Sequence, residues 1–260
     1  MTNYQDAWNQ KAEFWDELYG EYGNRFHREL VSPSVERLLN LKQGERVLDV
    51  ACGAGALARR LAELGASVTA VDFSEALIER AKSRGQRAGA AIDYQAVDAS
   101  AEDALVALGT FDAITCTMAM NDMAEVGPLF RAAATMLADG GRFVFATMHP
   151  AFNSNNPVFV AELADVDGVL QTTHFVKIAG YLSVPPVLGV GAPGEPNPHT
   201  YFHRPLGELL GQAFAAGLVL DGIEEPAFPK DADTEGRLSW YNFWQIPPVL
   251  AGRLRVTARR

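Results

Sequence analysis

The stretch Arg-Val-Leu-Asp-Val-Ala-Cys-Gly-Ala-Gly at residues 46–55 decides the fold of this chain. Its short apolar run at 47–50 is rich in valine and predicts a buried β-strand. Gly53 and Gly55 end the strand, and they let the backbone turn tightly and approach a ligand without a Cβ in the way. The order of strand and glycine turn, with a helix after them, is typical of the opening unit of a Rossmann-type nucleotide site.

Helical periodicity follows the turn and completes that unit. Apolar and charged side chains separate onto different faces: Leu57, Leu61 and Leu64 fall on one face, with Ala58 and Ala62 beside them, and Arg59, Arg60 and Glu63 face elsewhere.

The glycine spacing leaves two kinds of ligand open. Gly53-x-Gly55-x-x-Ala58 also fits the dinucleotide fingerprint, with Asp72 as the ribose acid about 20 residues on. Asp49 argues against a dinucleotide, because its carboxylate lies within the strand where a pyrophosphate would have to lie, and like charges repel. A ligand that carries an ammonium and a sulfonium would be attracted instead. S-adenosylmethionine is such a ligand, and it still offers a ribose diol to Asp72.

Two segments together resemble a known family. Residues 47–55 and the later Val-Asp-Phe-Ser at 71–74 are similar to motifs I and post-I of the class I S-adenosylmethionine-dependent methyltransferases of small-molecule type. The resemblance implies an α/β fold with a doubly wound, seven-stranded, mostly parallel sheet in the order 3-2-1-4-5-7-6. It also implies methyl transfer by in-line displacement to an O, N or C atom. An NAD(P)-dependent oxidoreductase and a non-catalytic S-adenosylmethionine-binding protein stay as alternatives.

The composition and net charge of the chain limit the kinds of molecule that it is expected to bind. The chain has 260 residues, 48% of them hydrophobic, and a formal net charge of −10, which argues against nucleic acid as a ligand. The Arg259-Arg260 pair is interpreted as a solvated tail. No apolar run is long enough to span a membrane, and the first residues lack the features of a signal peptide. Cys52 and Cys116 are interpreted as reduced packing residues of a cytoplasmic protein that is a monomer or homodimer.

The chain divides into four parts. Residues 1–43 should form a helical cap with helices at about 5–19 and 26–39, the second kinked or restarted near Pro33. Residues 44–149 should form the cofactor-binding core. Residues 150–204 hold seven of the 14 prolines and are interpreted as a lid with a small hairpin over the ligand mouth. Residues 205–260 should complete the sheet. The remaining strands are predicted at 67–71, 91–96, 111–116, 142–148, 218–224 and 249–256, with a helix at 126–137.

Ligands of such sheets bind at the carboxyl ends of the strands. The side chains at five predicted strand ends should therefore converge on one site. The resemblance implies that the cofactor contacts are Asp49, Ala51, Gly53, Gly55, Asp72, Phe73, Asp98, Ala99 and Met118. Met118 has core filling as its alternative role.

The acceptor side is less specific, because methyl transfer chiefly needs an aligned nucleophile. A base is required only when the acceptor must lose a proton early, and His149 is the candidate. A structural histidine that bonds to the lid is its alternative. Asn121 and Asp122 should orient the acceptor, and Tyr201 and His203 should complete the pocket wall.

A metal site is the remaining possibility on this side. His199 and His203 have i,i+4 spacing and could join His149 or His174 around a metal. Pro198 and Pro205 argue against a regular helix there. We therefore expect no metal.

Overall fold

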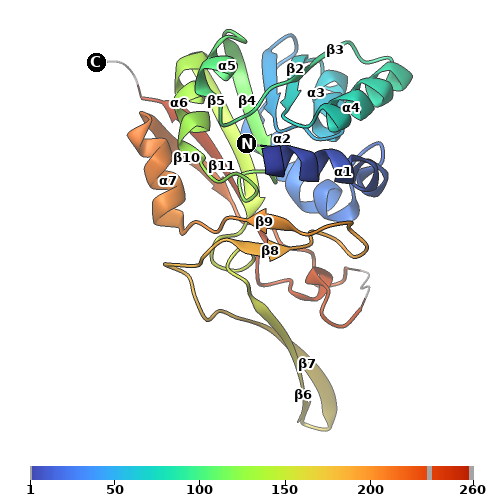
Figure 1. The fold of residues 1–260 in the computed structure, drawn as a ribbon. Coiled ribbons are helices and arrows are strands. Elements are labelled where there is room, and N and C mark those ends of the chain that lie inside the picture. Colours follow the sequence, from blue (N-terminus) through green and yellow to red (C-terminus); the bar gives the residue numbers. More distant parts are fainter. Residues whose placement is uncertain (1, 233–235, 258–260) are drawn as a thin grey trace.

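A seven-stranded sheet forms the centre of the computed structural model, which describes residues 2–232 and 236–257, so that the Arg259-Arg260 tail lies outside it (Figure 1). Its strand order is β10-β11-β5-β4-β1-β2-β3, and only β11 runs antiparallel to its neighbours. The predicted order 3-2-1-4-5-7-6 is confirmed. The strands are β1 Arg46–Val50, β2 Ser67–Asp72, β3 Ile92–Ala96, β4 Phe111–Thr117, β5 Leu137–Met148, β10 Leu218–Glu224 and β11 Val249–Val256.

Helices cover both faces of this sheet. On one face lie α5 (Glu102–Val106), α6 (Gly127–Met136) and α7 (Leu206–Ala215). On the other lie the π-helix η1 (His27–Val31), α2 (Ser32–Leu39), α3 (Ala56–Glu63) and α4 (Glu75–Ala88). Each face of the sheet has its own core: the first core lies under α5, α6 and α7, and the second lies under η1, α2, α3 and α4. Successive residues of β1 point to opposite faces, so Leu48 packs in the first core and Val47 in the second.

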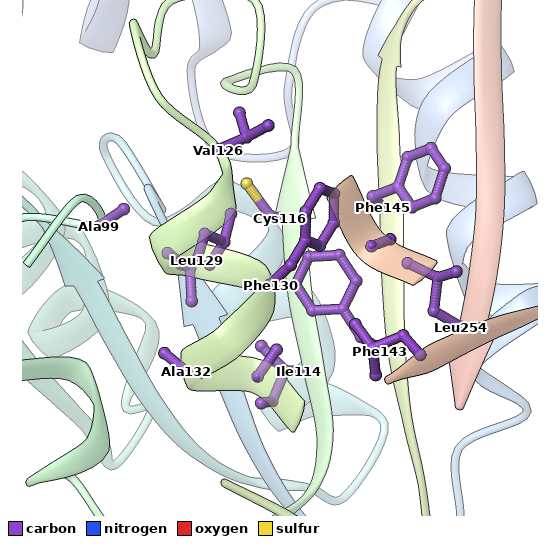
Figure 2. Close-up of a cluster of buried hydrophobic side chains, with 14 of the residues drawn as sticks. Ala99, Ile114, Cys116, Val126, Leu129, Phe130, Ala132, Phe143, Phe145 and Leu254 are labelled. Atoms are coloured by element: carbon purple, nitrogen blue, oxygen red, sulfur yellow. The ribbon is translucent and has the colours of Figure 1, made fainter. Parts of the chain in front are cut away.

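In the first core, aromatic side chains of α6 and β5 pack against each other. Figure 2 shows Phe130 of α6 above Phe143 of β5, with Leu254 of β11 beside them. The two phenyl rings meet edge to face with centroids 5.7 Å apart, and both side chains are fully buried. This core holds β4 and β5 in place and therefore fixes where their carboxyl ends lie.

The N-terminal helices precede the first strand, and η1 and α2 pack on the second core cluster. Helix α1 spans Thr2–Tyr19. The expected restart near Pro33 is confirmed, because the π-helix η1 ends at Val31 and Pro33 lies in the first turn of α2. The missing N–H of proline costs nothing there, since that donor has no partner inside a helix start.

Two side chains of α3 differ in burial from what an amphipathic pattern alone suggests, and one strand boundary is wrong. Arg59 is buried, because its guanidinium donates to the carbonyl oxygens of Ala54 at 2.7 Å and Glu21 at 2.8 Å. Leu64 caps the end of α3 and is 37% exposed. Strand β5 begins at Leu137 and not at residue 142, because pairing with β4 continues before a register shift.

The segment after β5 contains the predicted hairpin and a second short pair. Strands β6 (Val158–Val166) and β7 (Val169–Lys177) join through a two-residue Asp-Gly turn with both φ angles positive. Figure 1 shows this hairpin extending away from the main sheet. The pair β8 (Val187–Gly189) and β9 (His199–Tyr201) lies instead beside α1. The segment that follows this pair contacts the chain beyond β4, because the N–H of Phe202 donates to the Asn121 oxygen at 2.7 Å.

An aromatic connection anchors the base of the hairpin. Phe159 packs edge to face on Trp240 of the short 3-10 helix η2 (Trp240–Asn242) at 4.9 Å and on Phe243 at 5.3 Å.

Among the described residues, no helix has both the length and the apolar character needed to cross a bilayer.

Candidate functional site at the carboxyl ends of the strands

Asp49 lies at the centre of the strand edge, on β1 between β2 and β4. Its side chain is buried, and Oδ1 accepts a hydrogen bond from Thr115 Oγ1 at 2.8 Å. Oδ2 has no hydrogen-bond partner within residues 2–232 and 236–257. Burial raises the pKa of Asp49 to about 7, and the nearby charge of Asp72 adds to this rise. A buried carboxylate oxygen without a partner is costly unless a ligand supplies one.

The loop after β1 keeps space open above this carboxylate. Ala51, Gly53 and Gly55 all adopt positive φ angles, of 55°, 56° and 77°. Apart from its two neighbours in the chain, no described residue has an atom within 4 Å of the point where a Cβ of Gly53 would be, so a ligand can approach its backbone. At Gly55 a Cβ would lie 2.7 Å from the Tyr94 hydroxyl oxygen. Glycine is needed at 55 both for its φ and for this close approach.

Asp72 ties this loop to the end of β2. Its Oδ2 accepts the N–H of Gly53 at 2.9 Å, and its Oδ1 accepts the N–H of Ser74 at 2.9 Å. The side chain is buried, and burial raises its pKa to about 6 although both backbone hydrogen bonds oppose the rise. Asp72 therefore shapes the glycine loop in addition to any ligand contact.

The other predicted cofactor residues follow the neighbouring strands. Phe73 is partly buried next to Asp72, and Ala99 is buried in the first core. Asp98 follows β3, and its Oδ1 accepts both the N–H and the hydroxyl of Ser100 at 2.8 and 2.7 Å. Met118 follows β4 with a φ of 53°, and its N–H donates to the Ala146 oxygen at 2.7 Å. All of them lie at the same edge of the sheet, as the parallel strands require.

Asn121 and Asp122, the residues predicted to orient the acceptor, follow the end of β4. Asn121 Nδ2 donates to Asp122 Oδ1 at 2.9 Å, and the buried Asn121 Oδ1 has no partner among the residues that the structure describes. Burial raises the pKa of Asp122, whereas its contact with His199 lowers it. Tyr201 of β9 stacks on His199 with ring centroids 4.3 Å apart. Burial and then the charge of Asp122 raise the pKa of the Tyr201 phenol.

Both ring nitrogens of His149 and of His203 are in contact with other residues. His149 Nε2 donates to Glu225 Oε1 at 2.8 Å, and its Nδ1 accepts the N–H of Ala151 at 3.1 Å. Burial lowers the pKa of His149, which the Glu225 contact partly offsets. His203 Nε2 donates to the Tyr181 oxygen at 2.6 Å, and Nδ1 accepts from Ser154 Oγ. Both rings use both nitrogens, so a base role for His149 would need its Glu225 or Ala151 contact to be exchanged. The role of His149 as a base stays a prediction.

Sequence reasoning missed Lys11 and Glu195. Lys11 Nζ lies 3.2 Å from Glu195 Oε1, and both side chains are fully buried between α1 and the insertion. Lys11 Nζ also lies 2.8 Å from His199 Nδ1, and His199 Nε2 lies 3.3 Å from Asp122 Oδ1. A lysine on an otherwise aromatic helix face gave no local sign of burial, because its partner is 184 residues away.

The histidines that were candidates for a metal site, His199 and His203 with His149 or His174, do not gather around one point. His199 contacts Lys11, whereas His203 contacts Ser154. Within residues 2–232 and 236–257, no group of three or more His, Cys, Asp and Glu side chains is arranged to hold a metal ion. Burial raises the pKa of both cysteine thiols, and neither forms a disulfide.

The fold and the strand-edge carboxylates define a Rossmann-like protein of the nucleotide-binding class. Residues 47–141 match a family model described as a methyltransferase domain. A solved S-adenosylmethionine-dependent methyltransferase from Mesorhizobium loti is 26% identical and has a TM-score of 0.64. That likeness covers 86% of this chain and 96% of the other, so the chain has the class I methyltransferase fold.

Curated relatives match over shorter ranges. The ubiquinone biosynthesis O-methyltransferase of Bordetella avium is 30% identical over 151 residues, which are 55% of this chain and 61% of that protein. The protein of the same name from Xanthomonas axonopodis pv. citri is 38% identical over 109 residues, 41% of this chain and 44% of its own length. The chain thus spans about half the length of these relatives.

Proposed function

We propose that this chain transfers a methyl group from S-adenosylmethionine to a small-molecule acceptor. The observation that carries the proposal is the buried, unpartnered oxygen of Asp49 beside an open glycine loop, which Asp72 holds in place. A cationic ligand suits this arrangement, because an ammonium or sulfonium near Asp49 compensates its burial. The methyltransferase domain match over 47–141 supports the same activity.

Each strand end would hold a different part of the cofactor. Asp72 would accept hydrogen bonds from the ribose hydroxyls, and the backbone at Ala51, Gly53 and Gly55 would contact the amino-acid part near Asp49. Phe73, Asp98, Ala99 and Met118 would surround the adenine, with the carboxylate accepting from its amino group. When bound, S-adenosylmethionine supplies an electrophilic methyl group on a positively charged sulfur.

The chain's contribution to the transfer is chiefly placement. Asn121 and Asp122 would orient the acceptor from one side, and Tyr201 and His203 would wall the other, so that the nucleophile lines up with the carbon–sulfur bond. The curated relatives from Bordetella avium and Xanthomonas axonopodis pv. citri are both named O-methyltransferases, which favours an oxygen acceptor. An oxygen acceptor must lose its proton, and His149 or Asp122 would receive it.

The remaining expectations belong to the same proposal. Residues 1–43 would cap the site, 44–149 would bind the cofactor, 150–204 would cover the acceptor and 205–260 would complete the sheet. We propose a cytoplasmic monomer or homodimer whose ligands are small molecules.

Calorimetry tests the cofactor assignment against the dinucleotide alternative. We expect the protein to bind S-adenosylmethionine and S-adenosylhomocysteine with dissociation constants in or below the micromolar range, about −8 kcal/mol or tighter. NADH should not bind, because Asp49 faces the position that a pyrophosphate would occupy. Binding of NADH with no binding of S-adenosylmethionine would overturn the proposal.

Asp49 predicts how this affinity depends on pH. Its pKa is raised to about 7, so the unliganded protein carries a neutral Asp49 below that pH. A bound cation stabilises the carboxylate, so binding releases a proton. Affinity should therefore rise with pH up to about pH 7, by at most about tenfold per pH unit. Calorimetry in buffers of different ionisation enthalpy measures both the affinity and the released proton.

The matched control is Asp49→Asn. It should bind more weakly above pH 7 and lose the dependence near pH 7, leaving only the effect of Asp72, whose pKa is raised to about 6. A wild-type affinity that falls as pH rises towards 7 would contradict the assignment.

A further inference from the structure

A chain of four titratable side chains crosses the interface between α1 and the insertion. Its members, in order of contact, are Glu195, Lys11, His199 and Asp122. The ion pair at one end is fully buried, His199 is 4% exposed, and only Asp122 at the other end is partly accessible, at 15%. None of them lies in the matched stretch 47–141 except Asp122.

The contacts among these four side chains define which atoms donate and which accept. Glu195 accepts from Trp15 Nε1 at 3.0 Å, from the Gly191 N–H at 2.5 Å and from Lys11. Lys11 has only donors, so its contact with His199 makes Nδ1 an acceptor and places the ring proton on Nε2. Nε2 then donates to Asp122 Oδ1, which also accepts from Asn121. Glu195 Oε1 also lies 3.1 Å from Nδ1, but the Lys11 contact is shorter, at 2.8 Å, and favours the tautomer with its proton on Nε2.

Burial of these charges needs a reason beyond stability. Desolvating an ammonium and a carboxylate costs several kcal/mol for each ion, and a well-packed apolar pair often does as well. Trp8 and Trp15 already supply aromatic surface here, since the Trp8 ring packs on His199 at 5.0 Å. A buried ion pair that ends on a carboxylate at the strand edge is better explained by the position that it gives that carboxylate.

The same helix also contacts the cofactor side. Gln5 Nε2 donates to the Phe73 oxygen at 2.7 Å, and Asn9 Oδ1 accepts from Ser74 Oγ at 2.7 Å, next to Asp72. Helix α1 therefore bridges the end of β2 and the insertion, and Figure 1 shows it lying between them. A change in the insertion can reach the cofactor side through this one helix.

We propose that Lys11, Glu195 and His199 form a clasp that fastens residues 187–204 to α1 and positions the Asp122 carboxylate toward the acceptor. They are positioning residues, and the second half of the statement rests on the proposed function of the strand edge. While these contacts are formed, residues 187–204 stay fastened to α1, and the Asp122 carboxylate is held in one orientation toward the acceptor. When Lys11 is replaced by an uncharged residue, Glu195 is left buried without a cation, and residues 187–204 separate from α1.

Hydrogen exchange measured by mass spectrometry tests the fastening without any ligand. In Lys11→Met, amides of residues 187–201 should exchange at least about tenfold faster, while peptides of β1 and β4 stay unchanged. Lys11→Met/Glu195→Gln removes both charges and keeps an acceptor for Trp15 and Gly191, so it should recover most of the protection. Arg131→Met is the matched control, because its ion pair with Glu102 is exposed. Unchanged exchange in Lys11→Met, or no recovery in the double variant, overturns the clasp.

Imidazole ¹⁵N NMR of His199 tests the positioning, which a merely structural contact would not affect. The wild-type ring should carry its proton on Nε2 and none on Nδ1. In Lys11→Met, Nδ1 should gain a proton and donate to Glu195, which lies 3.1 Å away. In the double variant the introduced amide can donate to Nδ1, which should restore the Nε2 tautomer. An unprotonated Nδ1 in Lys11→Met would overturn the proposal.

S-adenosylmethionine binding separates this proposal from the function on which it rests. If the wild type fails to bind the cofactor, the proposed function fails, and exchange and NMR still decide whether the clasp exists. If the wild type binds and the clasp holds, the dissociation rate of S-adenosylhomocysteine should rise at least about threefold in Lys11→Met and return in the double variant. Equal rates in all three proteins would overturn the link between the clasp and the site.

Discussion

Asp72→Ala should lower the affinity for S-adenosylmethionine by about 2–3 kcal/mol, roughly 30–150-fold. The substitution removes a charged acceptor from the proposed ribose contacts. It also leaves the N–H groups of Gly53 and Ser74 without the partners that they have at 2.9 Å. Both losses act on the same loop, so the effect should exceed that of a single hydrogen bond. Isothermal titration calorimetry measures it directly.

Asp72→Asn separates the two contributions. Its amide oxygen can still accept one backbone N–H, but its charge is gone and its nitrogen can only donate. We expect an affinity between those of the wild type and Asp72→Ala. An affinity of Asp72→Ala equal to that of the wild type would show that the ribose is held elsewhere.

Phe130→Ala should reduce the free energy of unfolding by about 3–5 kcal/mol. The side chain is fully buried between α6 and β5 and meets Phe143 edge to face (Figure 2). Its removal leaves a cavity that the sheet on one side and the helix on the other cannot close. Urea unfolding followed by circular dichroism measures the loss.

Phe130→Leu keeps most of the volume and should cost less than about 1.5 kcal/mol. Cofactor affinity, extrapolated to the folded fraction, should stay unchanged in both variants, because Phe130 lies in the core and not at the strand edge. A loss below about 1 kcal/mol in Phe130→Ala would mean that the core collapses around the site of the deletion.

The sheet was largely predictable because its signals are local. Val47, Leu48 and Val50 form a short valine-rich run, and the glycines after them end it within a few residues. Asp49 and Asp72 could be placed at one edge because parallel strands end on the same side of a sheet. The antiparallel last strand came from the family resemblance and not from any pattern in the sequence.

The cover of the site was not predictable in this detail. The burial of Lys11 depends on Glu195, which is distant in the chain and lies in an irregular, proline-rich segment. Arg59 is buried because backbone oxygens at 21 and 54 accept its hydrogen bonds, and helical periodicity carries no information on those. The hairpin was expected over the mouth, but its direction depends on the packing of Phe159 on Trp240 and Phe243.

The crystal structure of the complex with S-adenosylmethionine is the most direct test of the central claim. We predict that the ribose hydroxyls lie within about 3 Å of the Asp72 carboxylate. The ammonium should lie on the side of Asp49, and the methyl group should face Asn121 and Asp122. A cofactor whose ribose lies away from Asp72, or whose methyl group points away from residues 121–122, would contradict the account.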